Sequence, residues 1–118
     1  VYDINTGSYN IYVRKAIYYI HKYYNEDISI DDLCENLNIN KSYFCNLFKK
    51  STNQTFSNFL NQFRVEKSKK LLADPSLSLL DVALEVGFTN QNYYTIVFKK
   101  MTNQTPSMYR KELISIKS

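Results

Sequence analysis

The chain contains nearly the same nine residues twice. The segment FKKSTNQTF occupies residues 48–56 and FKKMTNQTP occupies residues 98–106, so seven of the nine positions are identical. Upstream of each segment, SIDD at Ser29 and SLLD at Ser78 fit the pattern of a hydroxyl followed three residues later by a carboxylate, which is typical of a helix start. The repeat therefore predicts two copies of one folded unit.

Each copy has the pattern of two helices joined by a tight turn. Small or apolar residues align between the copies at spacings of three and four, which indicates one buried helical face: Ile30, Leu33, Cys34, Leu37 and Ile39 in the first, and Leu79, Val82, Ala83, Val86 and Phe88 in the second. A second helix is expected after Asn40 and after Asn90, because Asn caps the free N–H groups of a first turn. Between the helices, Asn38 and Gly87 tolerate a left-handed backbone. Each copy thus predicts a helix-turn-helix unit. A generic helical hairpin is the alternative, and two copies that agree at caps, turn and core disfavour it.

The repeated TNQT has a structural interpretation. Asn53 and Asn103 follow the second helix of each copy, where Asn can adopt the left-handed C-cap conformation. Thr55 and Thr105 then cap the next helix, and Pro106 suits a first helical position because its missing N–H costs nothing there. The phrase separates helices and is not itself a binding site.

Three further helices complete an all-α fold of seven helices, which suits a chain with only two Gly and two Pro. We expect them at about residues 8–24, with a stripe of Val13, Ile17, Ile20 and Tyr24, at 56–72, and at 107–114. The apolar residues of the middle helix are Phe56, Phe59, Leu60, Phe63, Leu71 and Leu72. The expected organisation is a linker remnant (1–8), a first helix-turn-helix unit with its leading helix (9–54), a long connecting helix (55–73), and a second unit with a closing helix (74–118), a homeodomain-like pair.

Composition excludes several classes of function. No apolar run approaches the roughly 18 residues of a membrane span and no secretory signal opens the chain, so we expect a cytoplasmic location. Because the sequence begins at Val1 without an initiator Met, we expect it to be part of a longer protein. Cys34 and Cys45 lack metal-type spacing and are expected to be free thiols. His21 is the only histidine, and no Gly-rich phosphate loop or paired acid cluster occurs, so neither an enzyme nor a cofactor is expected.

The net charge of +4 is unevenly distributed. Acids gather at the start of the first helix of each pair, where the helix dipole favours them. Bases gather on and after the second helix, with Lys49 and Lys50 repeated as Lys99 and Lys100. A solvated surface is the ordinary explanation of such lysines, but their duplication at the ends of two helices favours contacts with phosphates.

The outward faces of the two second helices are rich in side chains that can contact base edges. The first presents Lys41, Ser42, Tyr43, Cys45, Asn46 and Lys49, and the second presents Gln91, Asn92, Tyr93, Thr95, Ile96 and Lys99. A merely polar helix surface is the alternative. It accounts poorly for Ile96, since a lone aliphatic group on a solvent face suits contact with a thymine methyl.

Over about residues 9–111 the chain resembles the DNA-binding domain of the AraC/XylS family of bacterial transcription regulators. The resemblance rests on DISIDDLCENLNINKSYFCNLFKK, FLNQFRVEKSKKLL and LSLLDVALEVGFTNQNYYTIVFKKMTNQTPSMYRK. It implies two helix-turn-helix units whose recognition helices enter adjacent major grooves. It also implies double-stranded promoter DNA and RNA polymerase as partners, and a sensory or receiver domain in front of this one.

Carried over by position, the expected base-reading residues are Ser42, Cys45 and Asn46 in the first helix, and Gln91, Asn92, Thr95 and Ile96 in the second. The expected phosphate-binding residues are Lys41, Lys49, Lys50, Lys99, Lys100 and Arg110. Asn53 and Asn103 replace the glycine usual in the family, and Asn46 and Ile96 stand where relatives often have arginine. Arginine is the usual partner of guanine, so the replacement of arginine by Asn46 and Ile96 favours an A·T-rich site. A protein- or RNA-binding module on the same fold is the remaining alternative.

Overall fold

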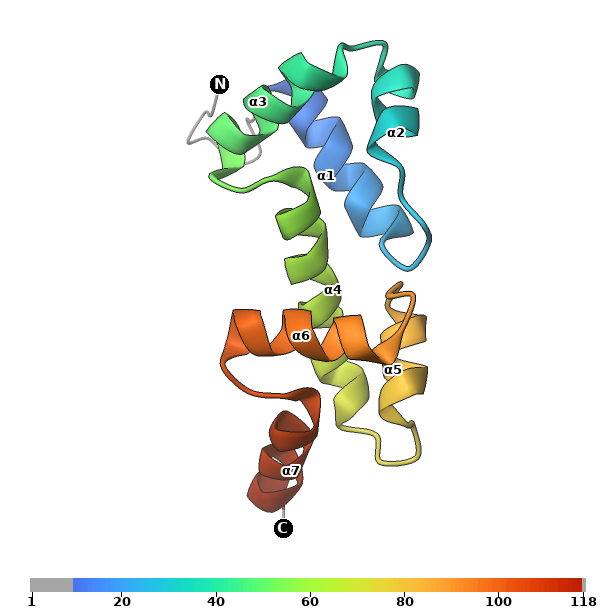
Figure 1. Ribbon diagram of the computed structural model, residues 1–118, viewed down its shortest axis with the longest axis vertical. Helices are drawn as coiled ribbons and strands as arrows, with labels where there is room; N and C mark the ends of the chain where they lie inside the picture. Colours follow the sequence, from blue (N-terminus) through green and yellow to red (C-terminus); the bar gives the residue numbers. More distant parts are fainter. Residues whose placement is uncertain (1–9, 118) are drawn as a thin grey trace. The chain divides into compact units, whose positions relative to one another are not determined.

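The computed structural model describes residues 10–117, and every regular element in that range is an α-helix (Figure 1). The seven helices confirm the expected all-α fold: α1 (Ile11–Tyr23), α2 (Ile30–Leu37), α3 (Lys41–Thr52), α4 (Phe56–Leu72), α5 (Leu79–Glu85), α6 (Gln91–Thr102) and α7 (Pro106–Lys117). Two compact units divide within α4, so that unit 1 ends at Leu60 and unit 2 begins at Asn61. The expected linker at residues 1–8 lies outside the described residues.

The helix starts follow from their capping residues. The Ser29 hydroxyl accepts a hydrogen bond from the Asp32 N–H at 3.2 Å, and the Ser78 hydroxyl accepts from the Asp81 N–H at 3.0 Å. In α5 the Asp81 carboxylate also accepts from the Ser78 N–H at 3.0 Å, which completes a capping box. Each of these bonds pairs an N–H that the helix itself leaves free, so the two first helices begin where their serines predict.

The turn inside each helix-turn-helix unit uses the left-handed backbone that its sequence predicts. Asn38 has φ 57° and Gly87 has φ 103°. The Ile39 N–H donates to the Cys34 carbonyl at 3.0 Å, and the Phe88 N–H donates to the Ala83 carbonyl at 2.9 Å. These bonds pair the last carbonyls of α2 and α5 and turn the chain toward the next helix.

In unit 1, α1 and α2 both pack against α3 (Figure 1). The core combines aliphatic residues of the first two helices with a cluster of phenylalanine rings 5.4–6.1 Å apart. Its buried residues are Val13, Ala16, Ile20, Leu33, Cys34, Phe44, Phe48, Phe56 and Leu60. The expected stripe of α1 was partly wrong, because Ile17 and Tyr24 are only half-buried and Ala16 is buried. Asn10 caps α1 through the Tyr12 N–H, and the expected start at Ser8 lies outside the described residues.

In unit 2, α5 and α7 both pack against α6. The core is again small and aliphatic on the first helix and aromatic on the second, with Phe88 5.2 Å from Tyr94 and Phe98 5.6 Å from Tyr109 between ring centroids. Its buried residues are Val65, Leu72, Val82, Ala83, Val86, Phe88, Tyr94, Val97, Phe98 and Pro106. The helix α7 begins at Pro106 and continues to Lys117, three residues beyond the expected end.

The buried face of α4 differs from the one that its apolar residues indicate. The buried positions are 56, 60, 64, 65, 68 and 72, so every fourth residue is buried, and two of them are the polar residues Arg64 and Ser68. The guanidinium of Arg64 lies 5.7 Å from the centre of the Phe88 ring, and the Ser68 hydroxyl donates to the Val65 carbonyl at 2.7 Å. Phe59, Phe63 and Leu71, which belong to the apolar set expected for this helix, are half-buried. A search for apolar periodicity misses a stripe that includes Arg and Ser.

Candidate nucleic-acid interface

The helices α3 and α6 are fixed at both ends by the same residues. The Asn40 side chain accepts from the Tyr43 N–H at 3.0 Å, and the Asn90 side chain accepts from the Tyr93 N–H at 2.7 Å. Both helices have 12 residues and end at an asparagine with a left-handed backbone, Asn53 with φ 63° and Asn103 with φ 65°. The expected Asn C-caps are therefore confirmed, and the two helices are equivalent in length and in capping.

A repeated threonine completes each C-terminal end. The hydroxyl of Thr52 donates to the Phe48 carbonyl at 2.8 Å and accepts from the Gln54 N–H at 3.2 Å. Thr102 makes the same two contacts, with the Phe98 carbonyl at 2.8 Å and the Gln104 N–H at 3.2 Å. Because Thr is a weak helix former, its place here is explained by these two bonds and not by helix propensity.

The inward faces of α3 and α6 determine which side chains remain outside. Phe44 and Phe48 bury one side of α3, and Tyr94, Val97 and Phe98 bury the matching side of α6. On the opposite side, five of the expected base-reading residues have exposed side chains: Ser42, Asn46, Gln91, Asn92 and Ile96. Cys45 and Thr95, which are equivalent in the two copies, are half-buried. Each helix thus presents a short polar strip, and the side chain of Ile96 is 57% exposed within the second strip.

The lysine pairs at the ends of these helices are exposed. Lys49 and Lys50 lie in the last turn of α3, and Lys99 and Lys100 lie in the last turn of α6. A basic side chain in the last turn also interacts favourably with the helix dipole, so a lysine at this position stabilises the helix by itself. The dipole does not require two lysines, and the duplicated pairs remain available for a polyanion.

Two of the expected phosphate-binding residues already have partners. The Lys41 ammonium lies 3.0 Å from the Asp31 carboxylate, and this contact raises the pKa of Lys41. Arg110 on α7 donates from Nε to the Leu72 carbonyl at 2.9 Å and from a terminal nitrogen to the Asp74 carbonyl at 3.2 Å. Arg110 therefore holds the C-terminal end of α4 against α7, a role that sequence spacing did not reveal because its partners are 36 and 38 residues away.

Tyr43 and Tyr93 are exposed aromatic residues at equivalent positions that we did not include among the contacting residues. The Tyr43 side chain is 57% exposed. The Tyr93 hydroxyl accepts from the Asn61 side chain at 3.1 Å, and its ring lies 5.9 Å from that of Phe88. Their repetition was the signal that could have identified them. Tyr93 is held by unit 2, whereas Tyr43 leaves its ring open on the α3 surface.

Both cysteines are free thiols, as expected, and burial in α2 raises the pKa of Cys34. Within residues 10–117 no group of three His, Cys, Asp or Glu side chains is placed to hold a metal ion. In the same range, no helix combines the length and the apolar character that a membrane span requires.

Comparison with known proteins agrees with this geometry. A family model described as a helix-turn-helix domain matches residues 33–112. The chain is 31% identical over 109 residues to the Msm operon regulatory protein of Streptococcus mutans, and the match covers 92% of this chain and 39% of that protein. It also shares its fold, with a TM-score of 0.78 at 20% identity, with a transcriptional regulator of Chromobacterium violaceum described as having an AraC-type DNA-binding domain; that match covers 87% of this chain and 92% of the other. The chain belongs to the AraC family of helix-turn-helix DNA-binding domains.

Two further solved structures match over most of the chain. The C-terminal domain of AraT, a response regulator from Geobacillus stearothermophilus, has a TM-score of 0.83 at 29% identity, with 89% of this chain and 88% of that chain covered. The DNA-binding domain of AdpA, described as a complex with a target DNA, shares the fold with a TM-score of 0.78 at 19% identity, covering 85% of this chain and 90% of that chain. The chain spans 39% of the length of the S. mutans regulator. It is a DNA-binding domain of a bacterial transcription regulator and not an enzyme.

Proposed function

We propose that α3 and α6 are both recognition helices, each of which enters a major groove of double-stranded promoter DNA. The observation that carries this proposal is the equivalence of the two helices in caps, length and exposed polar strip. A single reading helix would need no second copy with the same surface. By the general geometry of paired half-sites, two such helices contact segments about one helical turn, or about 34 Å, apart on the duplex.

The base-reading residues of this proposal are Ser42, Cys45 and Asn46 on α3, and Gln91, Asn92, Thr95 and Ile96 on α6. Asn and Gln pair best with adenine, and an exposed aliphatic side chain suits the methyl group of thymine. No arginine lies on the exposed strip of either helix, so the strongest guanine-binding side chain is missing from both. These side chains favour an A·T-rich recognition site.

The phosphate contacts of this proposal come from Lys49, Lys50, Lys99 and Lys100, with Lys41 and Arg110 contributing while they keep their internal partners. Arg110 uses two of its five N–H donors on carbonyl oxygens, which leaves donors for a phosphate. We add the Tyr43 hydroxyl on α3, because exposed Tyr hydroxyls commonly contact the sugar-phosphate backbone. Such contacts set the register of the domain on DNA without selecting a sequence.

The curated relatives are longer proteins, and one structural relative is described as the C-terminal domain of a response regulator. We propose that a sensory or receiver domain controls this domain in the full-length regulator, and that the DNA-bound protein contacts RNA polymerase. Transcription in vitro from a selected site, with purified polymerase and the full-length regulator, tests the second point through a change in transcript yield.

The primary test is selection from a random library of duplexes of about 25 base pairs, followed by titration of the selected site at two salt concentrations. Two conserved blocks about ten base pairs apart are expected, rich in A·T. A single block would limit base reading to one helix. A G·C-dominated motif would contradict the proposed A·T preference. Weak duplex binding together with saturable binding of RNA or a protein would favour the alternative module.

Single substitutions then separate the two kinds of contact. Asn92→Ala removes a base contact, so we expect affinity for the selected site to fall by about 1–3 kcal/mol and selectivity to relax at one base pair. Lys99→Ala removes a phosphate contact, so we expect weaker binding to all sequences and a salt slope lower by about one. Ser42→Ala and Lys49→Ala are the equivalent substitutions in unit 1, and each should show the same kind of effect as its counterpart in unit 2. Equal losses on all sequences from Asn92→Ala and Lys99→Ala would contradict the assigned roles.

A further inference from the structure

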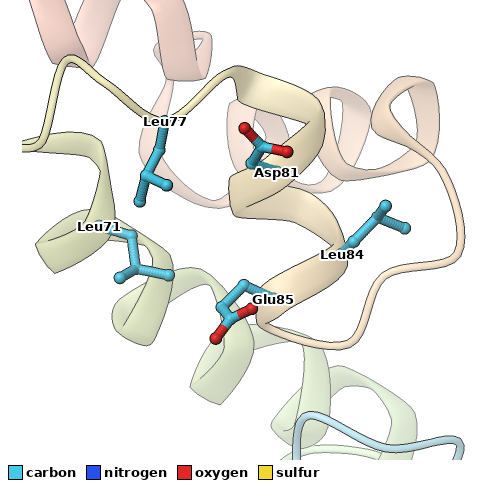
Figure 2. Close-up of a pocket in the computed structure, with 5 residues that line it drawn as sticks. All are labelled: Leu71, Leu77, Asp81, Leu84 and Glu85. Carbon is cyan, nitrogen blue, oxygen red and sulfur yellow. The ribbon is translucent and has the colours of Figure 1, made fainter.

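Unit 2 contains an open pocket that none of the proposed DNA-contacting residues lines. Its volume is about 550 Å³, and its lining residues are Leu71, Leu77, Asp81, Leu84 and Glu85. Figure 2 shows Leu77, on the loop after α4, pointing toward Leu71 on α4, with Asp81, Leu84 and Glu85 placed along α5. Two leucines of α5 are about half open to solvent, with Leu80 45% and Leu84 50% exposed.

The duplicated sequence shows that the fold does not require these exposed leucines. At the offset of 49 that aligns the first helices of the two units, Leu80 corresponds to Asp31 and Leu84 to Glu35. Both acids are exposed on α2, which has the same serine cap and the same buried residue positions as α5. Helix propensity does not explain Leu84 either, because Glu forms helices about as well as Leu. Exposed apolar groups that neither packing nor propensity requires indicate a contact with another molecule.

The charge of this surface indicates what kind of molecule fits. Asp81 and Glu85 lie one helical turn apart on α5, and in residues 10–117 neither carboxylate forms an ion pair. The hydrogen bonds that Asp81 accepts from Ser78 lower the pKa of Asp81 and keep it ionised at neutral pH. Two unpaired carboxylates repel the phosphates of DNA, although the chain as a whole has a charge of +4. A partner with apolar side chains and positive charge complements both features.

We propose that Leu71, Leu77, Leu80 and Leu84, with Asp81 and Glu85 at their border, bind a helical protein segment that presents leucine- or phenylalanine-like side chains flanked by Lys or Arg. An amphipathic helix places apolar anchors every three or four residues, which matches the spacing of Leu80 and Leu84 on α5. The pocket accepts an anchor, and the two carboxylates pair with the flanking bases. This surface gives the domain a protein-binding site that is separate from the proposed DNA-contacting residues of α3 and α6.

The test is a selection of random 16-residue peptides displayed on phage against the full chain, with counter-selection against the double variant Leu80→Asp/Leu84→Glu. This variant introduces the residues that unit 1 already has at the equivalent positions, so it suits the helix-turn-helix fold. Its circular dichroism spectrum and its affinity for a selected duplex control for folding. Synthetic versions of the enriched peptides are then titrated by fluorescence anisotropy. Ile11→Glu on α1 is the matched control for replacing an exposed apolar side chain by an acid outside this surface, because Ile11 is 50% exposed, as is Leu84.

The proposal is supported if the enriched peptides combine apolar residues at helical spacing with Lys or Arg. They should also bind the double variant at least tenfold more weakly than the wild type. Glu85→Lys, which changes an exposed side chain, should also weaken peptide binding severalfold, whereas Ile11→Glu should leave the affinity for the peptides unchanged. Several outcomes overturn the proposal: no enrichment over the double variant, enrichment of acidic peptides, or equal binding to Glu85→Lys. Self-association of the wild-type chain in sedimentation experiments that is lost in the double variant would instead assign this surface to a second copy.

Discussion

Replacement of Tyr94 by phenylalanine removes one atom from the centre of unit 2. The Tyr94 side chain is fully buried, and within residues 10–117 its hydroxyl has no hydrogen-bond partner of good geometry. Burial raises the pKa of Tyr94 to about 12, and the neighbouring Ser68 hydroxyl offsets this only in part. At the offset of 50 unit 1 has Phe44, which is equally buried, so Tyr94→Phe copies a ring that this fold already packs.

The expected magnitude depends on pH. At pH 7, removal of an unpaired buried hydroxyl should raise the free energy of unfolding by about 1 kcal/mol. In alkali the gain grows, because Tyr94 ionises near pH 10 in the unfolded chain and near pH 12 in the folded one. The contribution of neutral Tyr94 to the stability of the wild type is fully present below about pH 10, and it is lost as the pH rises from 10 to 12. A pKa difference of two units lowers the stability of the wild type by at most about 2.7 kcal/mol, and about half of this loss is reached at pH 11.

The assay is urea denaturation followed by circular dichroism at pH 7 and pH 11. We therefore expect the advantage of Tyr94→Phe to increase by about 1 kcal/mol between the two pH values. Tyr18→Phe, at a side chain that is 66% exposed, controls for loss of a hydroxyl. A variant less stable than wild type at pH 7 would show that the hydroxyl has a good partner. An advantage that is the same at both pH values would refute the argument from burial.

Three further substitutions test other contacts. Arg110→Ala removes two charge-assisted hydrogen bonds to the Leu72 and Asp74 carbonyls, so we expect the free energy of unfolding to fall by about 2 kcal/mol in urea denaturation, and Arg110→Lys should not restore it. Asn103→Ala places a Cβ without a polar side chain in a left-handed backbone and should cost about 1 kcal/mol, whereas Asn103→Gly should cost nothing in the same assay. Asp81 has a lowered pKa because it accepts from the N-cap serine, so its contribution is present above about pH 4 and is lost as pH falls through the folded value. The thermal midpoint of Asp81→Asn should therefore be lower than that of wild type at pH 7, with the difference smaller at pH 3.

Much of the candidate site follows from the sequence because capping is local. Asn40 and Asn90 bond to N–H groups three residues away, and Asn53 and Asn103 bond to carbonyls four residues back. The residues that decide where α3 and α6 begin and end thus lie within one helical turn of those ends. Once the ends and the inward aromatic residues are known, the helical period determines which side chains face outward.

The partners of individual polar side chains were not predictable in this way. Arg110 belongs to a sequence stretch that resembles a DNA-binding family, and only the folded chain shows its bonds to the end of α4. Tyr43 and Tyr93 occupy equivalent positions, and the Tyr93 hydroxyl accepts from Asn61, whereas among the residues that the structure describes the Tyr43 hydroxyl has no such bond. Such contacts depend on residues more than 30 positions apart, for which one sequence contains no local signal.

The sequence by itself therefore determined the seven helices, their caps, the left-handed asparagines and the duplication of one helix-turn-helix unit. These features follow from backbone groups that must find partners within a few residues. Only the tertiary structure decided that Arg64 and Ser68 are buried in α4, and that Leu80 and Leu84 stay exposed. The burial of a side chain depends on which distant helices cover it, and residue type alone does not specify that cover.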